Sequence, residues 1–285
     1  MTRIIGKRLS WMMRAYLLGP NHPMKMRFWA WLRKMQNFAL LTVSYAGNAW
    51  IALDEKDLLQ RDVLVSGFYE PEVYDALFQH ACSNEIVWDV GAHIGTFSVR
   101  ALSDPRVKEV HSFEPDPKNV SILIMNLALN KGQYKIHPYA LSQFSEIRKL
   151  FRTSETNTGL SSLSEARPFA DPRTTLRKRE VFDVSCKTAD QLVFQEGVLS
   201  PTLLKIDVEG WEREVLEGSK RLLCEKPPKA ITIEAACDSR GDITDQGLLF
   251  FLRDFGYQIE RIHRPLGAIE EVENYMAVYQ GRHDR

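Results

Sequence analysis

From about residue 58 onward, short apolar runs alternate with segments in which apolar positions recur every three or four residues. The short runs predict buried strands, and the periodic segments predict amphipathic helices. Strands are expected at 85–90, 109–114, 134–138, 202–207, 230–234, 257–263 and 273–279, and helices at 71–82, 117–130, 212–224 and 245–254 and after Gly95. This alternation is typical of parallel sheets. We therefore predict a doubly wound α/β domain with a mostly parallel seven-stranded sheet and helices on both faces.

The first 57 residues follow a different pattern, which predicts an N-terminal appendage before a domain at 58–285. Apolar residues recur at helical spacing over 24–35 with basic residues between them, as in a basic amphipathic helix. The uncharged stretch 35–53 holds polar residues and a Gly47-Asn48 turn, which favours a β-hairpin over a membrane span. For the helix we favour docking on the following domain, with contact of residues 1–37 with an anionic membrane as the alternative.

Composition and charge place the chain among folded, cytoplasmic proteins. It has 285 residues, 44% of them hydrophobic, and a formal net charge of zero. Residues 1–53 carry only basic charges, but no module that reads nucleic acid accompanies them, so we expect no nucleic-acid partner. The four cysteines lack metal or disulfide spacing, and Arg14 interrupts the early apolar run, so no export signal is expected. Peripheral contact with the inner face of the membrane stays open.

A glycine-containing turn follows the predicted strand at 85–90. Gly91 allows the chain to turn sharply, and Gly95 allows close approach to the backbone. The next strand ends at Glu114, about 20 residues later, where a carboxylate can bind both hydroxyls of a ribose. The two features together predict a nucleoside-binding site.

Asp89 narrows the choice of cofactor. A dinucleotide site calls for a third glycine and a helix start that is free for pyrophosphate, and Asp89 would repel phosphate. S-adenosylmethionine has no phosphate, and its cationic methionine end suits an acidic neighbour. We therefore favour a methyl donor over a nicotinamide cofactor, which remains the alternative.

Two carboxylates and a glycine follow the strand within LLKIDVEGWE at 203–212, at the sheet edge where open α/β sheets bind ligands. With DVGAHIGTFS at 89–98, FEPDP at 113–117 and a helix ending in NLALN at 126–130, the sequence resembles the FkbM family of S-adenosylmethionine-dependent methyltransferases. The resemblance covers most of residues 60–240. It implies a Rossmann-like class I methyltransferase fold, S-adenosylmethionine as cofactor, and sugar or natural-product hydroxyls as acceptors.

The resemblance also implies roles for individual residues. Asp89, Gly91 and Gly95 would shape the methionine pocket, and Glu114 would bind the ribose. Glu70 would close the pocket from outside. Further cofactor contacts are expected from His93, which stands where many members have Asn, and from Thr96, Asp116, Asn119, Ala140, Leu141 and Ser142.

Methyl transfer to a hydroxyl requires an in-line approach and loss of the hydroxyl proton. Asp207 is the first candidate to orient or deprotonate the acceptor, and Glu209 is the second, although Glu209 can equally cap the following helix. His137, at a predicted strand end, is a reserve catalytic candidate. Asp207, Glu209 and Glu234 together offer the oxygen ligands that Mg²⁺ prefers.

The acceptor pocket is expected to be built by the N-terminal appendage and by a long inserted loop at 152–181, which is rich in polar and turn residues. Neither segment holds a motif that specifies a substrate. We predict a sugar or glycan acceptor. A polyketide-type or other small natural product, and a non-catalytic nucleoside-binding protein of the same fold, are the alternatives.

Overall fold

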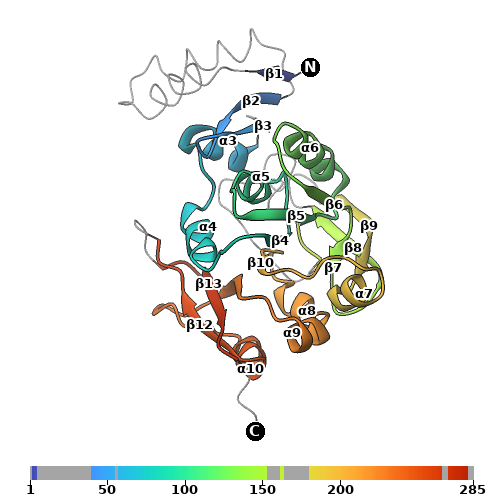
Figure 1. Ribbon diagram of the computed structural model, residues 1–285, viewed down its shortest axis with the longest axis vertical. Helices are drawn as coiled ribbons and strands as arrows, with labels where there is room; N and C mark the ends of the chain where they lie inside the picture. Colours follow the sequence, from blue (N-terminus) through green and yellow to red (C-terminus); the bar gives the residue numbers. More distant parts are fainter. Residues whose placement is uncertain are drawn as a thin grey trace.

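The computed structural model describes residues 2–4, 40–54, 57–152, 161–163, 180–264 and 269–281 (Figure 1). Several expectations lie outside these residues: the basic helix at 24–35, most of the inserted loop, and the turn at 265–267. Within the described part of the chain, no helix is both long enough and apolar enough to cross a membrane.

A seven-stranded sheet forms the centre of the domain, in the order β12-β13-β11-β10-β4-β5-β6. Its strands are β4 (Glu85–Val90), β5 (Val107–Phe113), β6 (Tyr134–His137), β10 (Leu203–Ile206), β11 (Ala230–Ala236), β12 (Tyr257–Arg261) and β13 (Val272–Tyr279). Neighbouring strands are parallel except at β13, which runs antiparallel to both β11 and β12. The predicted mostly parallel seven-stranded sheet is confirmed.

Helices cover both faces of this sheet, as predicted, because alternate residues of the strands are apolar on both sides (Figure 1). Val87 and Leu203 pack with the helices of one face, whereas Trp88 and Leu204 pack with those of the other. The first face carries α3 (Leu58–Ser66), α4 (Pro71–Phe78), α5 (Thr96–Leu102) and α6 (Pro117–Ala128), and the second carries α7 (Ala189–Phe194), α8 (Glu212–Glu217), α9 (Lys220–Glu225) and α10 (Gln246–Asp254).

The helix expected at 212–224 is divided into α8 and α9. The helix is interrupted at Gly218, where an added Cβ atom would lie 2.0 Å from the carbonyl oxygen of Ser142. Glycine at this position allows α8 to approach the backbone of residues 142 and 143, which connects the second helical layer to the segment after β6.

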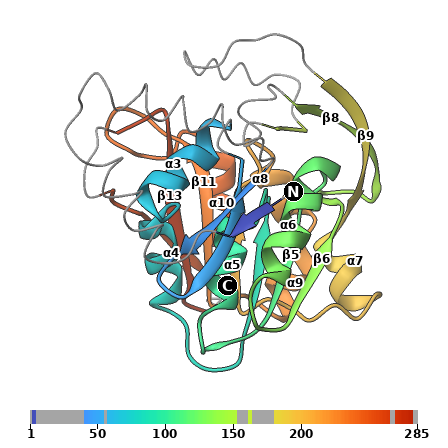
Figure 2. The same ribbon diagram turned by 90° about the horizontal axis from the view of Figure 1, so that it is seen from above.

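A second, three-stranded sheet lies beside β6 and was not predicted (Figure 2). It consists of β7 (Ala140–Leu141), β8 (Glu146–Arg152) and β9 (Glu180–Lys187), in the order β7-β9-β8. Antiparallel pairing brings Arg152 opposite Glu180, so the inserted loop leaves and returns along neighbouring strands. Most residues of β8 and β9 are at least partly exposed, and their apolar alternation is therefore weak.

The predicted β-hairpin of the appendage is confirmed as β2 (Leu40–Tyr45) and β3 (Ala49–Leu53), and β1 (Thr2–Ile4) pairs with β2. Val43 and Ile51 are buried in the same apolar cluster as Leu123 and Leu127 of α6. The hairpin thus packs on the first helical layer. The division of the chain into two domains at residue 57 stays a prediction.

Candidate functional site

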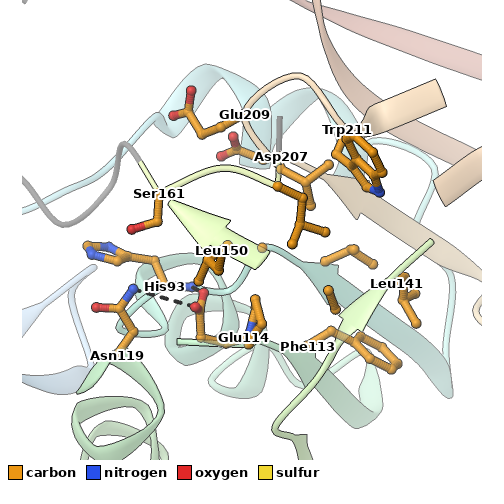
Figure 3. A pocket seen from close by; sticks show the side chains of 16 residues that line it. His93, Phe113, Glu114, Asn119, Leu141, Leu150, Ser161, Asp207, Glu209 and Trp211 are labelled. Atoms are coloured by element: carbon orange, nitrogen blue, oxygen red, sulfur yellow. Dashed lines mark hydrogen bonds between the residues drawn. The ribbon is translucent and has the colours of Figure 1, made fainter. Parts of the chain in front are cut away.

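Two adjoining pockets open at the carboxyl ends of β4, β5 and β10. The empty space in the first, counted together with the part open to solvent, is about 560 Å³, and in the second about 410 Å³. In Figure 3, Asp207, Glu209 and Trp211 lie on one side of the first pocket, and Asn119, Glu114 and Phe113 lie on the other. The second pocket extends toward α3 and α5. Both pockets share four lining residues, namely Gly91, His93, Asp207 and Glu209.

The turn after β4 brings this edge of the sheet together. Gly91 has a φ of +85°, and a Cβ atom there would lie 1.8 Å from the carbonyl oxygen of Asp207. Gly95 has a φ of +88° and abuts Leu123 of α6, whose Cδ1 would lie 2.6 Å from an added Cβ. Both glycines are therefore required by backbone conformation and by close packing, and Gly91 allows Asp207 to lie directly against the turn.

Three predicted site residues adopt left-handed backbone conformations. The φ angles are +41° for Glu70, +51° for His93 and +54° for Glu209. For residues with a side chain this region costs about 1–2 kcal/mol each, and such strain concentrates at functional sites. These backbone conformations turn amides and side chains toward the carboxyl edge of the sheet, where an extended chain would not place them.

Glu114 lies at one end of the first pocket and is 5% exposed. Its carboxylate accepts hydrogen bonds from the amides of His93 and Asp116, both at 2.8 Å. Burial raises its pKa to about 7, although these amides favour the charged form. Asn119 lies beside it, and its buried Oδ1 has no partner among the described residues. This end of the pocket therefore presents polar groups that a ligand can satisfy.

Asp89 is fully buried at the second pocket. Its Oδ2 accepts a hydrogen bond from Ser98 Oγ at 2.5 Å, and its Oδ1 has no partner among the described residues. Burial raises the pKa of Asp89, and nearby Lys205 opposes this shift. Thr96, for which a cofactor contact is predicted, also lines the second pocket.

Lys205 was not among the predicted site residues. It is 4% exposed, lines the second pocket, and its Nζ donates to Asp207 Oδ2 at 2.7 Å. Burial opposes its charge, yet the carboxylates of Asp207, Asp89 and Glu70 raise the pKa of Lys205 above its ordinary value. The sequence did contain a signal for this residue, namely a lysine inside the apolar run of β10. A buried charge requires a partner, so such a lysine indicates a nearby carboxylate.

Asp207 and Glu209 line both pockets, and the charges of two further carboxylates, Glu234 and Glu70, act on the same cluster. One ligand oxygen from each of Asp207, Glu209 and Glu234 can lie within 4.8 Å of the others. Burial, followed by the charges of Asp207 and Glu209, raises the pKa of Glu234 well above its ordinary value. Burial, followed by the charge of Asp207, raises the pKa of Glu70 to about 7. The cluster can therefore hold protons and accept hydrogen bonds from hydroxyl groups.

Apolar side chains form the far wall of the first pocket. Ala140 and Leu141, for which cofactor contacts are predicted, line it together with Phe113, Leu150 and Leu163. Trp211 also lines the pocket and was missed, because its sequence position indicates only a helix start. Ser142 does not line the first pocket, and its hydroxyl accepts a hydrogen bond from Trp211 Nε1 at 3.1 Å.

Six predicted site residues lie outside the lining of both pockets, namely Glu70, Gly95, Asp116, His137, Ser142 and Glu234. For two of them, Asp116 and His137, the structure shows other partners. Asp116 caps α6 by accepting from the amide of Lys118, and its carboxylate forms an ion pair with Arg152 of β8. His137 is hydrogen-bonded on both ring nitrogens, to His111 at 3.0 Å and to the Tyr139 hydroxyl at 2.9 Å. Burial lowers the pKa of His137 to about 4. These placements favour structural roles for both residues.

Comparison with known proteins agrees with these motifs. Residues 89–259 match the family model described as the methyltransferase FkbM domain. The hexuronic acid methyltransferase AglP of Haloferax volcanii is 26% identical over 175 residues, which cover 61% of this chain and 66% of that protein. The 31-O-demethyl-FK506 methyltransferase FkbM of Streptomyces tacrolimicus is 26% identical over 216 residues, covering 68% of this chain and 80% of that protein.

Among solved structures, the methyltransferase FkbM of Methylobacillus flagellatus is similar to 90% of this chain, over 72% of its own length. The TM-score of that superposition is 0.44, and the sequence identity is 15%.

Proposed function

Because the chain belongs to the FkbM methyltransferase family, whose model spans more than half of it, we propose that it transfers the methyl group of S-adenosylmethionine to a hydroxyl of a sugar or glycan. Methyl transfer and the Rossmann-like fold follow from the family. The oxygen acceptor and its chemical class are the proposal. The observation that carries it is the position of Asp207, which lines both pockets at the point where they meet.

The residues of the first pocket fit an adenosine group. The Glu114 carboxylate is held by two amides beside the orphaned Asn119 Oδ1, which suits the hydroxyls of a ribose. Phe113, Leu141 and Leu150 provide an apolar wall for the adenine ring. In the second pocket, the unpartnered Asp89 Oδ1 suits the ammonium group of methionine. The bound cofactor would supply an electrophilic methyl group and leave as S-adenosylhomocysteine.

The carboxylate cluster would bind the acceptor hydroxyl and accept its proton. Lys205 engages Asp207 Oδ2, which leaves Oδ1 to accept the hydrogen bond of the acceptor hydroxyl and fix its direction of approach. The proton would pass to Asp207 or be shared with Glu209 and Glu234, which lie within the same cluster. Carboxylates also bind neighbouring hydroxyls of a sugar ring, so the cluster favours a polyhydroxylated acceptor.

A polyketide-type acceptor is the second candidate, favoured by the name of the Streptomyces relative. AglP, whose name indicates a hexuronic acid substrate, favours the sugar. The retained Asp89, Glu114, Asp207 and Glu209 oppose a protein that binds the nucleoside without catalysis. A peripheral membrane contact through residues 1–37 lies outside the described residues, and flotation with anionic vesicles tests it.

Asp207, Glu209 and Glu234 also fit Mg²⁺ in the type of ligand they offer. Lys205 already pairs with Asp207, so a divalent ion would compete with an ammonium group for the same carboxylate. We therefore derive the handling of the proton from the carboxylates themselves and treat dependence on Mg²⁺ as a matter for experiment.

The first test is isothermal titration with S-adenosylhomocysteine, with NADH as the control. We expect micromolar binding of S-adenosylhomocysteine that Glu114→Ala abolishes, and no binding of NADH. Transfer of a labelled methyl group is then measured on a panel of neutral sugars, uronic acids, glycans and macrolides. Absence of S-adenosylhomocysteine binding to the folded protein would overturn the proposal, whereas transfer confined to the macrolides would replace the sugar by the second candidate.

A further inference from the structure

Lys205 and Asp89 occupy paired positions on neighbouring parallel strands. In the ladder between β10 and β4, Lys205 is the register partner of Asp89. Leu203 and Val87, two residues earlier on each strand, pack in the same apolar cluster. Because side chains alternate along a strand, Lys205 and Asp89 project from the same face of the sheet. Both line the second pocket next to the Gly91 turn.

The pair has unused hydrogen-bonding capacity. An ammonium group has three donors, and the contact with Asp207 Oδ2 uses one of those of Lys205. Asp89 uses one oxygen for Ser98, while its other oxygen is buried without a partner among the described residues. A buried polar atom without a partner is costly and calls for a ligand or water. The pocket therefore offers donors and an acceptor side by side.

The charges of the pocket point to one class of ligand. Among its described lining residues, Lys205 is the one with a permanent positive charge, because burial lowers the pKa of His93. Asp89, Asp207 and Glu209 supply negative charge. A group with both an ammonium and a carboxylate on neighbouring atoms matches this arrangement, since each charge meets its opposite. The α-amino acid end of a cofactor has this form.

We propose that Lys205 binds the α-carboxylate of the methionine part of S-adenosylmethionine, beside Asp89, which binds the α-ammonium. This assignment rests on the proposed function, because it assumes that the adenosine occupies the first pocket. Gly91 and His93 line both pockets, so a ligand held by Glu114 at one end reaches Lys205 at the other. Lys205 is then a cofactor-binding residue as well as the partner of Asp207.

The test measures binding without turnover. Wild-type protein is titrated with S-adenosylhomocysteine, with its decarboxylated and deaminated analogues, and with methylthioadenosine, which lacks both groups. We expect loss of the carboxylate to weaken binding by about 10- to 100-fold, as for a buried charge-assisted hydrogen bond. Equal affinity for S-adenosylhomocysteine and its decarboxylated analogue would overturn the assignment of Lys205. Failure of all four ligands to bind would overturn the proposed function itself.

Lys205→Met links the effect to the residue. It is expected to weaken S-adenosylhomocysteine binding to the level of the decarboxylated analogue and to leave the affinity of that analogue unchanged. Equal weakening of both ligands would show that Lys205 acts only by positioning Asp207. Lys229→Met is the matched control, because Lys229 also pairs with a buried carboxylate, Glu85, at the opposite edge of the sheet. If Lys205→Met does not fold, the wild-type ligand series and Lys205→Arg decide the question.

Discussion

The side chain of Asn126 in α6 hydrogen-bonds both backbone groups of Ala52 in β3. Its Oδ1 accepts from the Ala52 amide at 2.7 Å, and its Nδ2 donates to the Ala52 carbonyl at 3.2 Å and to the Ile94 carbonyl at 2.8 Å. Asn130, one helical turn later, repeats the arrangement with Trp50, at 2.8 Å in both directions. The two side-chain amides bond to the free edge of β3, and Asn126 joins the N-terminal hairpin to the turn after β4, which borders both pockets.

Asn126→Ala should destabilise the protein by about 2–3 kcal/mol, because it leaves the buried amide and carbonyl of Ala52 without partners. Urea unfolding followed by circular dichroism measures the change. Asn48→Ala, at the exposed hairpin turn, is the control and should change the free energy of unfolding by less than about 0.5 kcal/mol. Equal stabilities of the two variants would mean that the hairpin is not held by this contact.

Affinity for S-adenosylhomocysteine should rise with pH through about 7. Glu114 of the free protein binds a proton with a pKa of about 7, whereas bonding to both ribose hydroxyls requires the ionised form. Binding therefore releases a proton, and the affinity should fall about tenfold per pH unit below 7 and level off above it. Titration calorimetry from pH 5.5 to 8.5 checks this. Glu114→Gln should bind weakly and with no such slope, and an unchanged slope in that variant would assign the proton to another group.

Asp207→Asn should lower kcat by about 10²- to 10⁴-fold while affinity for S-adenosylhomocysteine stays near wild type. The substitution removes the proton acceptor but keeps a polar partner for Lys205. Initial rates with saturating cofactor give the comparison. His137→Gln, outside both pockets, should retain turnover. If His137→Gln folds and loses activity while Asp207→Asn does not, the catalytic group has been assigned to the wrong strand end.

Gly91→Ala should destabilise the protein by about 2 kcal/mol or more and abolish cofactor binding, because the added Cβ would overlap the carbonyl oxygen of Asp207. Gly47→Ala is a matched control: Gly47 has nearly the same φ, +84°, but no atom lies within 4 Å of an added Cβ. Its cost should be about 1 kcal/mol from backbone strain alone. Thermal unfolding and calorimetry separate the two effects, and similar costs would refute the argument from close packing.

Treatment with EDTA should leave methyl transfer unchanged, because Lys205 already compensates the charge of Asp207 in the carboxylate cluster. The measurement is the rate before and after chelation and after addition of Mg²⁺. A loss of activity that Mg²⁺ restores would place the ion among Asp207, Glu209 and Glu234, and Glu234→Gln should then raise the Mg²⁺ concentration required.

The central sheet could be predicted because its middle strands β4, β10 and β11 are buried on both faces and stand out as largely apolar runs. The second sheet could not, since β8 and β9 expose much of one face and read as a polar insertion. The interruption of the helix expected at 212–224 could not be predicted, because it depends on the close approach of Gly218 to the backbone of Ser142, which is distant in the sequence.

The sequence by itself determined which residues reach the carboxyl edge of the sheet, because a strand followed by a glycine turn or an acid can be recognised locally. Gly91, Glu114 and Asp207 were found in this way. Only the tertiary structure decided which groups meet there: that Asp116 pairs with Arg152 rather than lining a pocket, and that Lys205 is buried against Asp207. A local sequence pattern indicates whether a residue is buried. It does not identify the partner that allows a charged residue to be buried, because that partner can come from another part of the chain.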